Sequence, residues 1–479
     1  MGVKLMTLDI IIHGGYIITM EGNGTGVIND GAVGIKGNEI VAVGNTNDIM
    51  NKYTAHRYIN AHNKAVMPGF IDCHIHTSDT IVRGGCQDID NWMEKGIWPL
   101  LSLADDDALV AGSMVNIIEA VKAGTTTFCD YETPMLKLIP NHIKVGTRLV
   151  AANMINELPS NNKNIPGEIY PFDFVVGNQK LQDNIKMVEQ YHGFKDNLIT
   201  CMFGPQAVDM CSAELLLEIK NLAEKYDVGI HMHLAQGDRE VAQMTKRYGK
   251  RSVEYAQELG LLDERLLAIH LTTATEEEVK VVAESGAGMV LCTGSIAILG
   301  GNLPPAEEFG KYSRRVGLGT DQSPGNNCNN MFNEMKFTSI AHKYKHRNGT
   351  SHPAWKVMRM ATIEGARTLG MGNIIGSLKP GKKADIIIID LTYPNLSPIM
   401  DWPIRNIVPN LVYAGRGNEV EMVIIDGEVI VEDHNILTVD EKEAVEHINK
   451  CAKKICLDLE QDKNSNDLPL VKWTREGYQ

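Results

Sequence analysis

The sequence lacks the excess of basic residues that a polyanionic partner requires. Its 479 residues include 46 Lys and Arg against 60 Asp and Glu, so the formal net charge at pH 7 is -14 with histidine neutral. Because phosphate backbones are bound by basic surfaces, this balance argues against a nucleic-acid ligand. We therefore expect no nucleic-acid partner.

Paired cysteines and long apolar runs are also missing. The nine cysteines are an odd number and form no CxxC pair, which favours reduced thiols over a disulfide framework. No apolar stretch approaches the length of a membrane span, and the short apolar run near the N-terminus contains Asp9 and His13. We expect a soluble, unprocessed cytoplasmic protein with no membrane partner.

The centre of the chain alternates strand-like and helix-like segments. A chain of this length exceeds one ordinary core, so a barrel-sized domain with a smaller one is expected. Eight strands with intervening helices predict a distorted (β/α)8 barrel, the TIM barrel, over residues 67–375. The predicted strands are Val66 to His76, Thr125 to Tyr131, Arg148 to Ile155, Thr200 to Pro205, Gly229 to Ala235, Leu266 to Leu271, Gly288 to Cys292 and Val316 to Asp321.

Both ends of the chain have a different, β-rich character. From Leu8 to Val66, short β-rich runs alternate with Gly, Asn and Asp turn signals, the pattern of a small antiparallel sheet. Ala384 to Leu391 and Glu421 to Asp433 repeat it, the second around an Asp-Gly hairpin signal at 426–427. We expect residues 1–66 and 376–479 to build one small β-sandwich domain, followed after Thr438 by a helix and a polar tail.

Two histidines end the first predicted barrel strand. His74 and His76 are two positions apart, so a strand projects both to the same face. Imidazole nitrogen is a preferred ligand of zinc, iron and related cations. An HxH pair alone leaves open both a metal site and a chance pair at a turn.

Later polar residues also close barrel strands, at the end where barrel enzymes keep their chemistry. His233 ends the fifth strand and His270 the sixth, whereas His231 lies one layer deeper and is expected to be a satisfied core histidine. Asp321 closes the apolar eighth strand, and such an acid must be paired, solvated or metal-bound. We therefore predict a metal site at the mouth of the barrel.

The motifs PGFIDCHIHT, HMHLAQ, AIH and GLGTD, in this order and spacing, resemble the amidohydrolase superfamily over nearly the whole chain. The segments NWMEKGIWPL, MATIEGARTLGM and GSLKPGKKADIIIIDL are more closely similar to the branch that contains triazine hydrolases (atrazine chlorohydrolase-like and melamine deaminase-like), S-adenosylhomocysteine deaminases and guanine or cytosine deaminases. The resemblance implies a hydrolase of non-peptide C–N bonds that removes an amine from a nitrogen heterocycle such as a triazine, pyrimidine or purine.

The resemblance also implies a ligand set and a mechanism. One divalent metal, zinc first and iron second, would be bound by His74, His76, His233 and Asp321, with His270 as a further ligand or a partner of the bound water. The metal would lower the pKa of that water and Asp321 would accept its proton. The fourth strand carries no lysine, which favours one metal over two, and relatives with this added β-domain imply a homo-oligomer.

Two residues are expected to contact the substrate. Trp92 belongs to the long segment from Ser78 to Asp107, which also carries Trp98 and Pro99 and is too apolar for a free loop, so we expect it in the pocket wall. Gln206 stands where many of the similar deaminases have histidine, and 292–296 replaces their Pro-x-Ser-Asn turn. These differences argue against the usual purine or adenosyl substrates.

Gln236 is the departure that bears on the chemistry. Deaminases of this kind carry a glutamate there, whereas glutamine can hydrogen-bond but cannot transfer a proton at neutral pH. Three accounts stay open: a leaving group such as chloride that needs no proton, Asp321 acting as base and acid in turn, or weak hydrolysis. The alternatives to deamination are therefore a hydrolytic dechlorinase of a halogenated s-triazine and a catalytically silent metal-binding protein.

Overall fold

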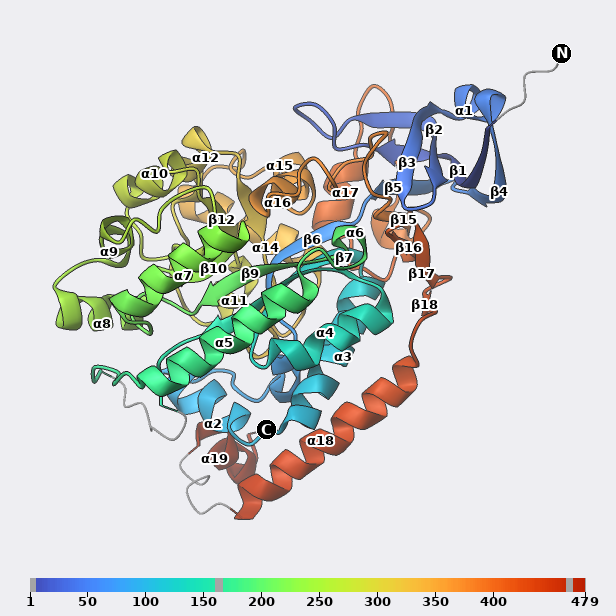
Figure 1. Ribbon diagram of the computed structural model, residues 1–479. Coiled ribbons are helices and arrows are strands. Elements are labelled where there is room, and N and C mark those ends of the chain that lie inside the picture. Colours follow the sequence, from blue (N-terminus) through green and yellow to red (C-terminus); the bar gives the residue numbers. More distant parts are fainter. Residues whose placement is uncertain (1–5, 160–166, 462–467, 479) are drawn as a thin grey trace.

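A computed structural model describes residues 6–159, 167–461 and 468–478, and its strands form two sheets (Figure 1). The first is the barrel sheet, in which all neighbouring strands pair in parallel. Its members are β6 (Phe70–His76), β7 (Thr125–Glu132), β8 (Arg148–Ile155), β9 (Ile199–Pro205), β10 (Gly229–Leu234), β11 (Leu266–His270), β12 (Gly288–Leu291), β13 (Val316–Leu318) and β14 (Asp321–Gln322).

The barrel closes through its eighth strand, which is divided into β13 and β14. β13 pairs with β12, whereas β14 pairs with β6, where Asp321 lies opposite Ile75. Between them, a Cβ added at Gly319 would lie 2.8 Å from both the Cβ and the carbonyl oxygen of His74. Glycine thus allows the last strand to approach the first closely. The predicted barrel is confirmed.

The barrel helices are bounded by capping residues and bury an apolar face against the sheet. α7 (Ala213–Tyr226) begins where the Ser212 side chain accepts from the Leu215 amide, and it ends at Asp227 with φ 53°. Its apolar stripe, Leu215, Leu216 and Ile219, is buried against the barrel. α3 (Asp106–Lys122), α4 (Met135–Val145), α5 (Phe174–Tyr191), α10 (Glu276–Glu284), α14 (Met331–His346) and α15 (Ala354–Met360) cover other parts of the sheet (Figure 1). α8 (Asp238–Tyr248) follows β10 and packs beside α9 (Ser252–Glu258).

The second sheet is built from both chain ends, as predicted. Its strands are β1 (Met6–Ile18), β2 (Val27–Lys36), β3 (Glu39–Asn45), β4 (Tyr53–Asn60), β5 (Lys64–Pro68), β15 (Ile386–Asp390), β16 (Val420–Ile425), β17 (Glu428–Glu432) and β18 (Asn435–Ile436). β5 and β15 pair antiparallel and so join the two ends. The limits of the domains, at 66 and 376, stay a prediction.

The expectation of a purely antiparallel sheet at the N-terminus is wrong. β1 pairs antiparallel with β2 but parallel with both β4 and β5. The reason is the connection: α1 (Thr46–Lys52) carries the chain from β3 into β4, so that β4 enters beside β1 in the same direction. The hairpin predicted at Asp426-Gly427 does join β16 to β17, with φ of 51° and 84° at its two central residues.

A buried ion cluster fastens the two sheets together. Arg148 of β8 is fully buried and donates through Nε to Asp385 at 2.6 Å and through Nη2 to Asp426 at 3.0 Å. Asp385 directly precedes β15 and Asp426 directly follows β16, so both lie at one edge of the second sheet's strands. The Arg148 guanidinium therefore supplies the counter-charge of both carboxylates and links the barrel to this sheet, beside the apolar core that the two share.

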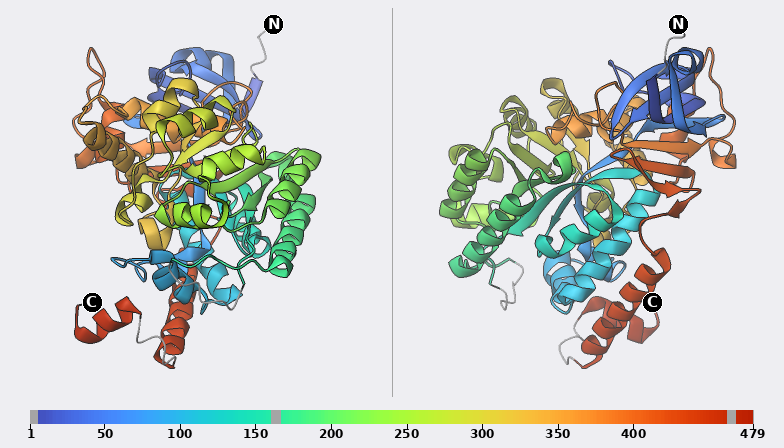
Figure 2. Two further views of the ribbon diagram at one scale, coloured as in Figure 1. Left: turned by 90° about the vertical axis from the view of Figure 1, so that its left-hand side faces the viewer. Right: turned by 45° about the vertical axis from the view of Figure 1, so that its right-hand side comes forward.

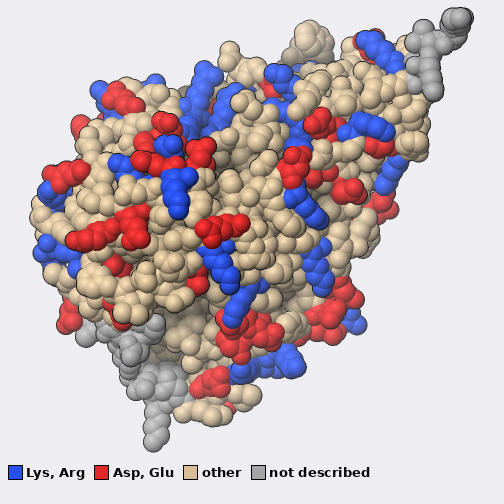
Figure 3. Space-filling view, in the orientation of Figure 1, with Lys and Arg blue, Asp and Glu red and all other residues tan. Residues whose placement is uncertain are grey.

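The C-terminal helix α18 (Glu441–Gln461) runs away from the second sheet and packs against α3 (Figure 2). The tail beyond it was expected to be a polar extension, but part of it forms a further helix, α19 (Pro469–Glu476). Acidic and basic side chains alternate over the face drawn in Figure 3, without one extended basic patch there. In the described parts of the chain, each helix is too short or too polar to cross a membrane.

Candidate active site

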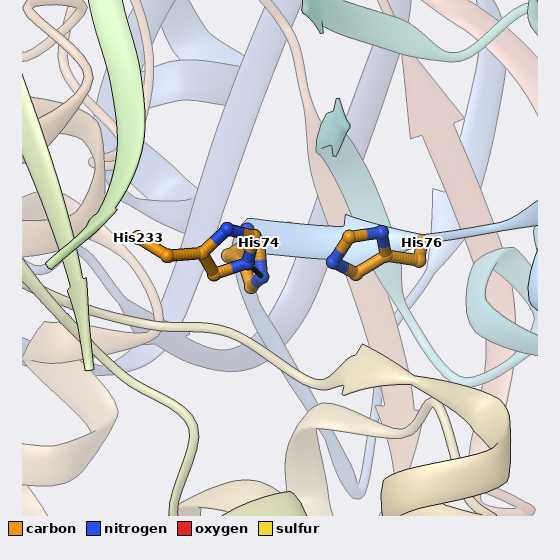
Figure 4. A group of neighbouring side chains, drawn as sticks. All are labelled: His74, His76 and His233. Carbon is orange, nitrogen blue, oxygen red and sulfur yellow. Dashed lines mark hydrogen bonds between the residues drawn. The ribbon is translucent and has the colours of Figure 1, made fainter. Parts of the chain in front are cut away.

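Four polar side chains from the barrel strands meet at the C-terminal mouth of the barrel. His74 Nε2 lies 3.2 Å from His233 Nε2 and 3.3 Å from Asp321 Oδ1. His76 Nε2 lies 3.5 Å from the same oxygen. Figure 4 shows the rings from β6 and β10 directed toward one another. All four side chains are buried, so ligand-type atoms from three strands converge on one small volume.

The ring orientations are set by hydrogen bonds on the far side of each imidazole. His233 donates through Nδ1 to the Gln206 carbonyl at 2.9 Å, which directs its Nε2 toward the cluster. His74 Nδ1 lies 2.7 Å from His231 Nε2, and His231 Nδ1 lies 3.3 Å from the Cys129 sulfur. His231 therefore lies one layer below the cluster and has a neighbour at each ring nitrogen, as expected for a core histidine two residues before His233 in the strand.

Asp321 is held in an unusual backbone conformation. Its φ is 62°, a region that residues other than glycine seldom adopt and that recurs at functional sites. The preceding residue, Thr320, donates from its backbone and its hydroxyl to the Asp72 carboxylate at 3.0 and 2.6 Å. Asn329 donates to the Asp321 carbonyl at 2.9 Å. These bonds fix the carboxylate in place beside His74.

The electrostatics of the cluster suit a divalent metal. Burial is the main cause that lowers the pKa of His76 to about 3, that of His270 to about 4 and that of His233 as well. Burial opposes ionisation of Asp321, but the hydrogen bond and charge of the surrounding histidines outweigh it and hold its pKa below the usual range. Neutral imidazoles and an ionised carboxylate are the protonation states in which these groups bind metals.

His270 and Gln236 occupy the next position around the mouth. His270 offers a nitrogen within 4.8 Å of ligand atoms of His74 and Asp321, and its Nδ1 has no partner in the described structure. Gln236 Nε2 lies 3.3 Å from His270 Nε2. The buried Glu240 carboxylate accepts from the backbone amides of Ala235 and Gln236 at 2.9 and 2.7 Å, which fixes the turn that presents Gln236.

A cavity of about 750 Å³ opens over this cluster. Its wall includes both residues expected to contact the substrate, Trp92 and Gln206, together with His76, His233 and Gln236. Gln206 accepts a hydrogen bond from the Asn156 amide at 2.6 Å. The long segment expected in the pocket wall does lie there, folded into the short helices η1 (Ser78–Val82), η2 (Met93–Ile97) and α2 (Trp98–Leu101).

Two buried acids in this cavity were not predicted from the sequence. Asp79 of η1 and Glu132 of β7 each place a carboxylate oxygen within 4.8 Å of the other and of a His76 nitrogen. Burial, followed by the negative charge of neighbouring carboxylates, raises the pKa of both. Like Asp321, Glu132 is an acid at the end of an apolar strand. It was not predicted as a site residue because the predicted second strand ended at Tyr131, one residue before it.

Comparison with known proteins relates the whole chain to one family. A family model described as the amidohydrolase family matches residues 65–430. A 5-methylthioadenosine/S-adenosylhomocysteine deaminase of Syntrophus aciditrophicus is 32% identical over 451 residues, which cover 94% of this chain and 98% of that protein. The family match spans the barrel and the part of the second sheet between β5 and β17, whereas the relative covers nearly the whole chain.

Solved structures give the same relation. An adenosine deaminase from Xanthomonas campestris with bound zinc superposes with a TM-score of 0.87 at 27% identity, covering 95% of this chain and all of that one. The atrazine chlorohydrolase TrzN from Arthrobacter aurescens, complexed with zinc, has a TM-score of 0.82 at 22% identity over 92% of this chain and all of that one. The second likeness is one of fold alone.

Proposed function

The chain belongs to the amidohydrolase family, and from this premise we propose that it is a zinc-dependent deaminase of an amino-substituted nitrogen heterocycle. Adenine nucleosides are the first substrates to test because similar deaminases act on them, and the differences at Gln206 and 292–296, which argue against such substrates, make this test informative. The observation that carries the proposal is the convergence of His74, His76, His233 and Asp321 beneath one cavity. These four residues would hold the metal, with His270 beside them.

Each side chain has a role that its surroundings support. A bound divalent metal supplies Lewis acidity and makes water a stronger nucleophile at neutral pH. Asp321, ionised and facing the three histidines, accepts the proton of the attacking water as a C–O bond forms at the amino-bearing ring carbon. When the C–N bond breaks, Asp321 returns that proton to the leaving nitrogen, and ammonia departs from an oxo-substituted ring.

Gln236 then positions the substrate and does not transfer a proton. Its side-chain amide lies beside His270 at the edge of the cavity, so it can donate a hydrogen bond to a ring nitrogen without exchanging a proton. This arrangement supports the account in which Asp321 serves as base and acid in turn. Chloride as the leaving group would remove the need for the second proton transfer, so dechlorination remains the alternative enzymatic function.

The test is a turnover screen with the zinc-loaded protein. The panel contains adenosine, 5′-deoxyadenosine, an aminopyrimidine, and the amino and chloro forms of one s-triazine, with ammonia and chloride measured separately. We expect ammonia release, with the heterocycle converted to its oxo form. Chloride release alone would favour the dechlorinase, and no turnover of any compound by protein carrying one zinc per chain would favour a silent metal-binding protein. The cytoplasmic location and the homo-oligomeric state stay predictions.

A further inference from the structure

One wall of the cavity carries two buried carboxyl groups with no cation of the described residues paired to them. Asp79 and Glu132 are 6% and 2% exposed, and neither forms an ion pair with a residue in the described ranges. Lys180 also lines the cavity, but its ammonium donates to the Asn156 side chain at 2.9 Å and forms no ion pair with either acid. The carboxyl pair therefore faces the cavity without a protein counter-ion.

The polar groups of this wall also lack hydrogen-bond partners. Glu132 accepts from the Ser78 amide at 3.2 Å, but no donor among the described residues reaches the Asp79 carboxylate. The Ser78 hydroxyl, in a side chain that is 1% exposed, likewise has no partner there. Because buried polar groups are nearly always satisfied, these side chains point to a ligand that completes them.

The charge balance indicates the sign of that ligand. Both carboxyl groups line the cavity, each has an oxygen within 4.8 Å of the other, and neither is paired with a lysine or arginine of the described residues. Two acids buried together without a counter-charge are unfavourable, and a cation that enters between them relieves this.

We propose that Asp79 and Glu132 form a subsite that binds a cationic group of the substrate, an ammonium or amidinium distinct from the amine that is removed. The inference rests on the proposed function, since it makes the substrate a heterocycle with a basic substituent. An organic cation suits this wall better than a second metal ion. His76 directs its Nε2 to Asp321, and the aromatic side chains of Trp92 and Trp98 can stabilise an alkylammonium.

The first test compares two ligands that differ by one group. 5′-Deoxyadenosine and 5′-amino-5′-deoxyadenosine carry hydrogen or ammonium at C5′. A second pair, with the ammonium or a methyl group at the end of a two-carbon extension, allows for a different reach. Calorimetry with zinc-loaded protein should give a dissociation constant roughly 10- to 100-fold lower for an ammonium ligand than for its uncharged counterpart, the range of one or two hydrogen bonds to charged groups. Equal affinity for both members of each pair overturns the proposal.

Variants assign the effect to the two acids. Asp79→Asn and Glu132→Gln should each bring the ratio of the two dissociation constants of a pair toward one. The control is Glu334→Gln, which should keep the wild-type ratio, because Glu334 is a buried acid outside this cavity that accepts from the Thr293 and Gly294 amides. A preference that persists in both cavity variants overturns the assignment. The wild-type ligand pairs suffice if a variant fails to fold.

Two further readouts separate the possible failures. Binding does not require turnover, so an ammonium preference in a protein that deaminates nothing refutes the proposed function and leaves the subsite in place. Deamination of both members of a pair with equal kcat/KM refutes the subsite and leaves the function. Two zinc ions per chain in the wild type and one in Asp79→Asn would identify the occupant as a metal ion and overturn the organic cation.

Discussion

Gln236→Glu tests whether a missing proton donor limits this enzyme. The two side chains have nearly the same shape, and the Gln236 backbone is held by the Glu240 carboxylate, so the new carboxyl group should occupy the place of the amide, 3.3 Å from His270 Nε2. The nearby negative charges of Glu240 and Asp321 should raise its pKa above that of a free glutamate. A glutamate in that position could carry a proton between water and the leaving nitrogen.

The size of the effect follows from what one positioned acid or base contributes. General acid–base catalysis is worth about 10²- to 10⁴-fold, or roughly 3–5 kcal/mol of activation free energy. We therefore expect kcat/KM for an amino-substituted heterocycle to rise by up to that amount if protonation of the amine limits the rate. For the chloro form of the same ring we expect no gain, because chloride leaves without a proton.

The assay measures ammonia and chloride release from the two forms of one heterocycle, for wild type and variant with equal zinc content. Gln206→Glu is the matched control, since it adds the same charge to the same cavity but at a side chain engaged with Asn156. A gain in both variants would reflect charge in the cavity rather than proton transfer. Equal loss on both substrates in Gln236→Glu would refute the proton-shuttle account and leave Gln236 as a positioning residue.

Three further predictions address the metal, the pH dependence and the domain contact. His233→Ala should lose both bound zinc and activity, and a stoichiometric zinc content by mass spectrometry would contradict its place among the ligands. Burial lowers the pKa of His342 to about 3 and of His352 to about 2, so both are neutral when folded and protonate near 6.5 when unfolded. Below pH 6.5 the unfolded state thus binds more protons, and urea unfolding at saturating zinc should show stability falling as the pH drops, by about 1.4 kcal/mol per pH unit for each histidine. His342→Leu should reduce that slope, and an unchanged slope would contradict the assignment. Arg148→Met should lower the free energy of unfolding by about 3–5 kcal/mol, because it leaves Asp385 buried without its partner. Adding Asp385→Asn to this variant should recover part of that loss. A change in the free energy of unfolding within about 0.5 kcal/mol for Arg148→Met would show that the ion cluster is dispensable.

Local sequence patterns sufficed for the barrel and for the convergence of its histidines. A strand has a period of two, so the HxH pair had to share a face, and a residue that ends a parallel barrel strand must lie at the common mouth. For this reason His74, His76, His233 and Asp321 could be placed together without knowledge of any contact. The Asp-Gly hairpin could also be predicted from local sequence, since its turn type depends on two adjacent residues.

Tertiary structure decided what depends on through-space neighbours. No local pattern relates Arg148 to Asp385, which are brought together only when the barrel packs against the second sheet. The parallel pairing of β1 with β4 depends on where α1 returns the chain, and that is a matter of packing rather than of strand propensity. Asp79 and Glu132 become a pair only because the segment after β6 folds into η1 beside the end of β7. Sequence periodicity determines which way a side chain points from its own element, whereas the partner it meets depends on how distant elements close around a shared core.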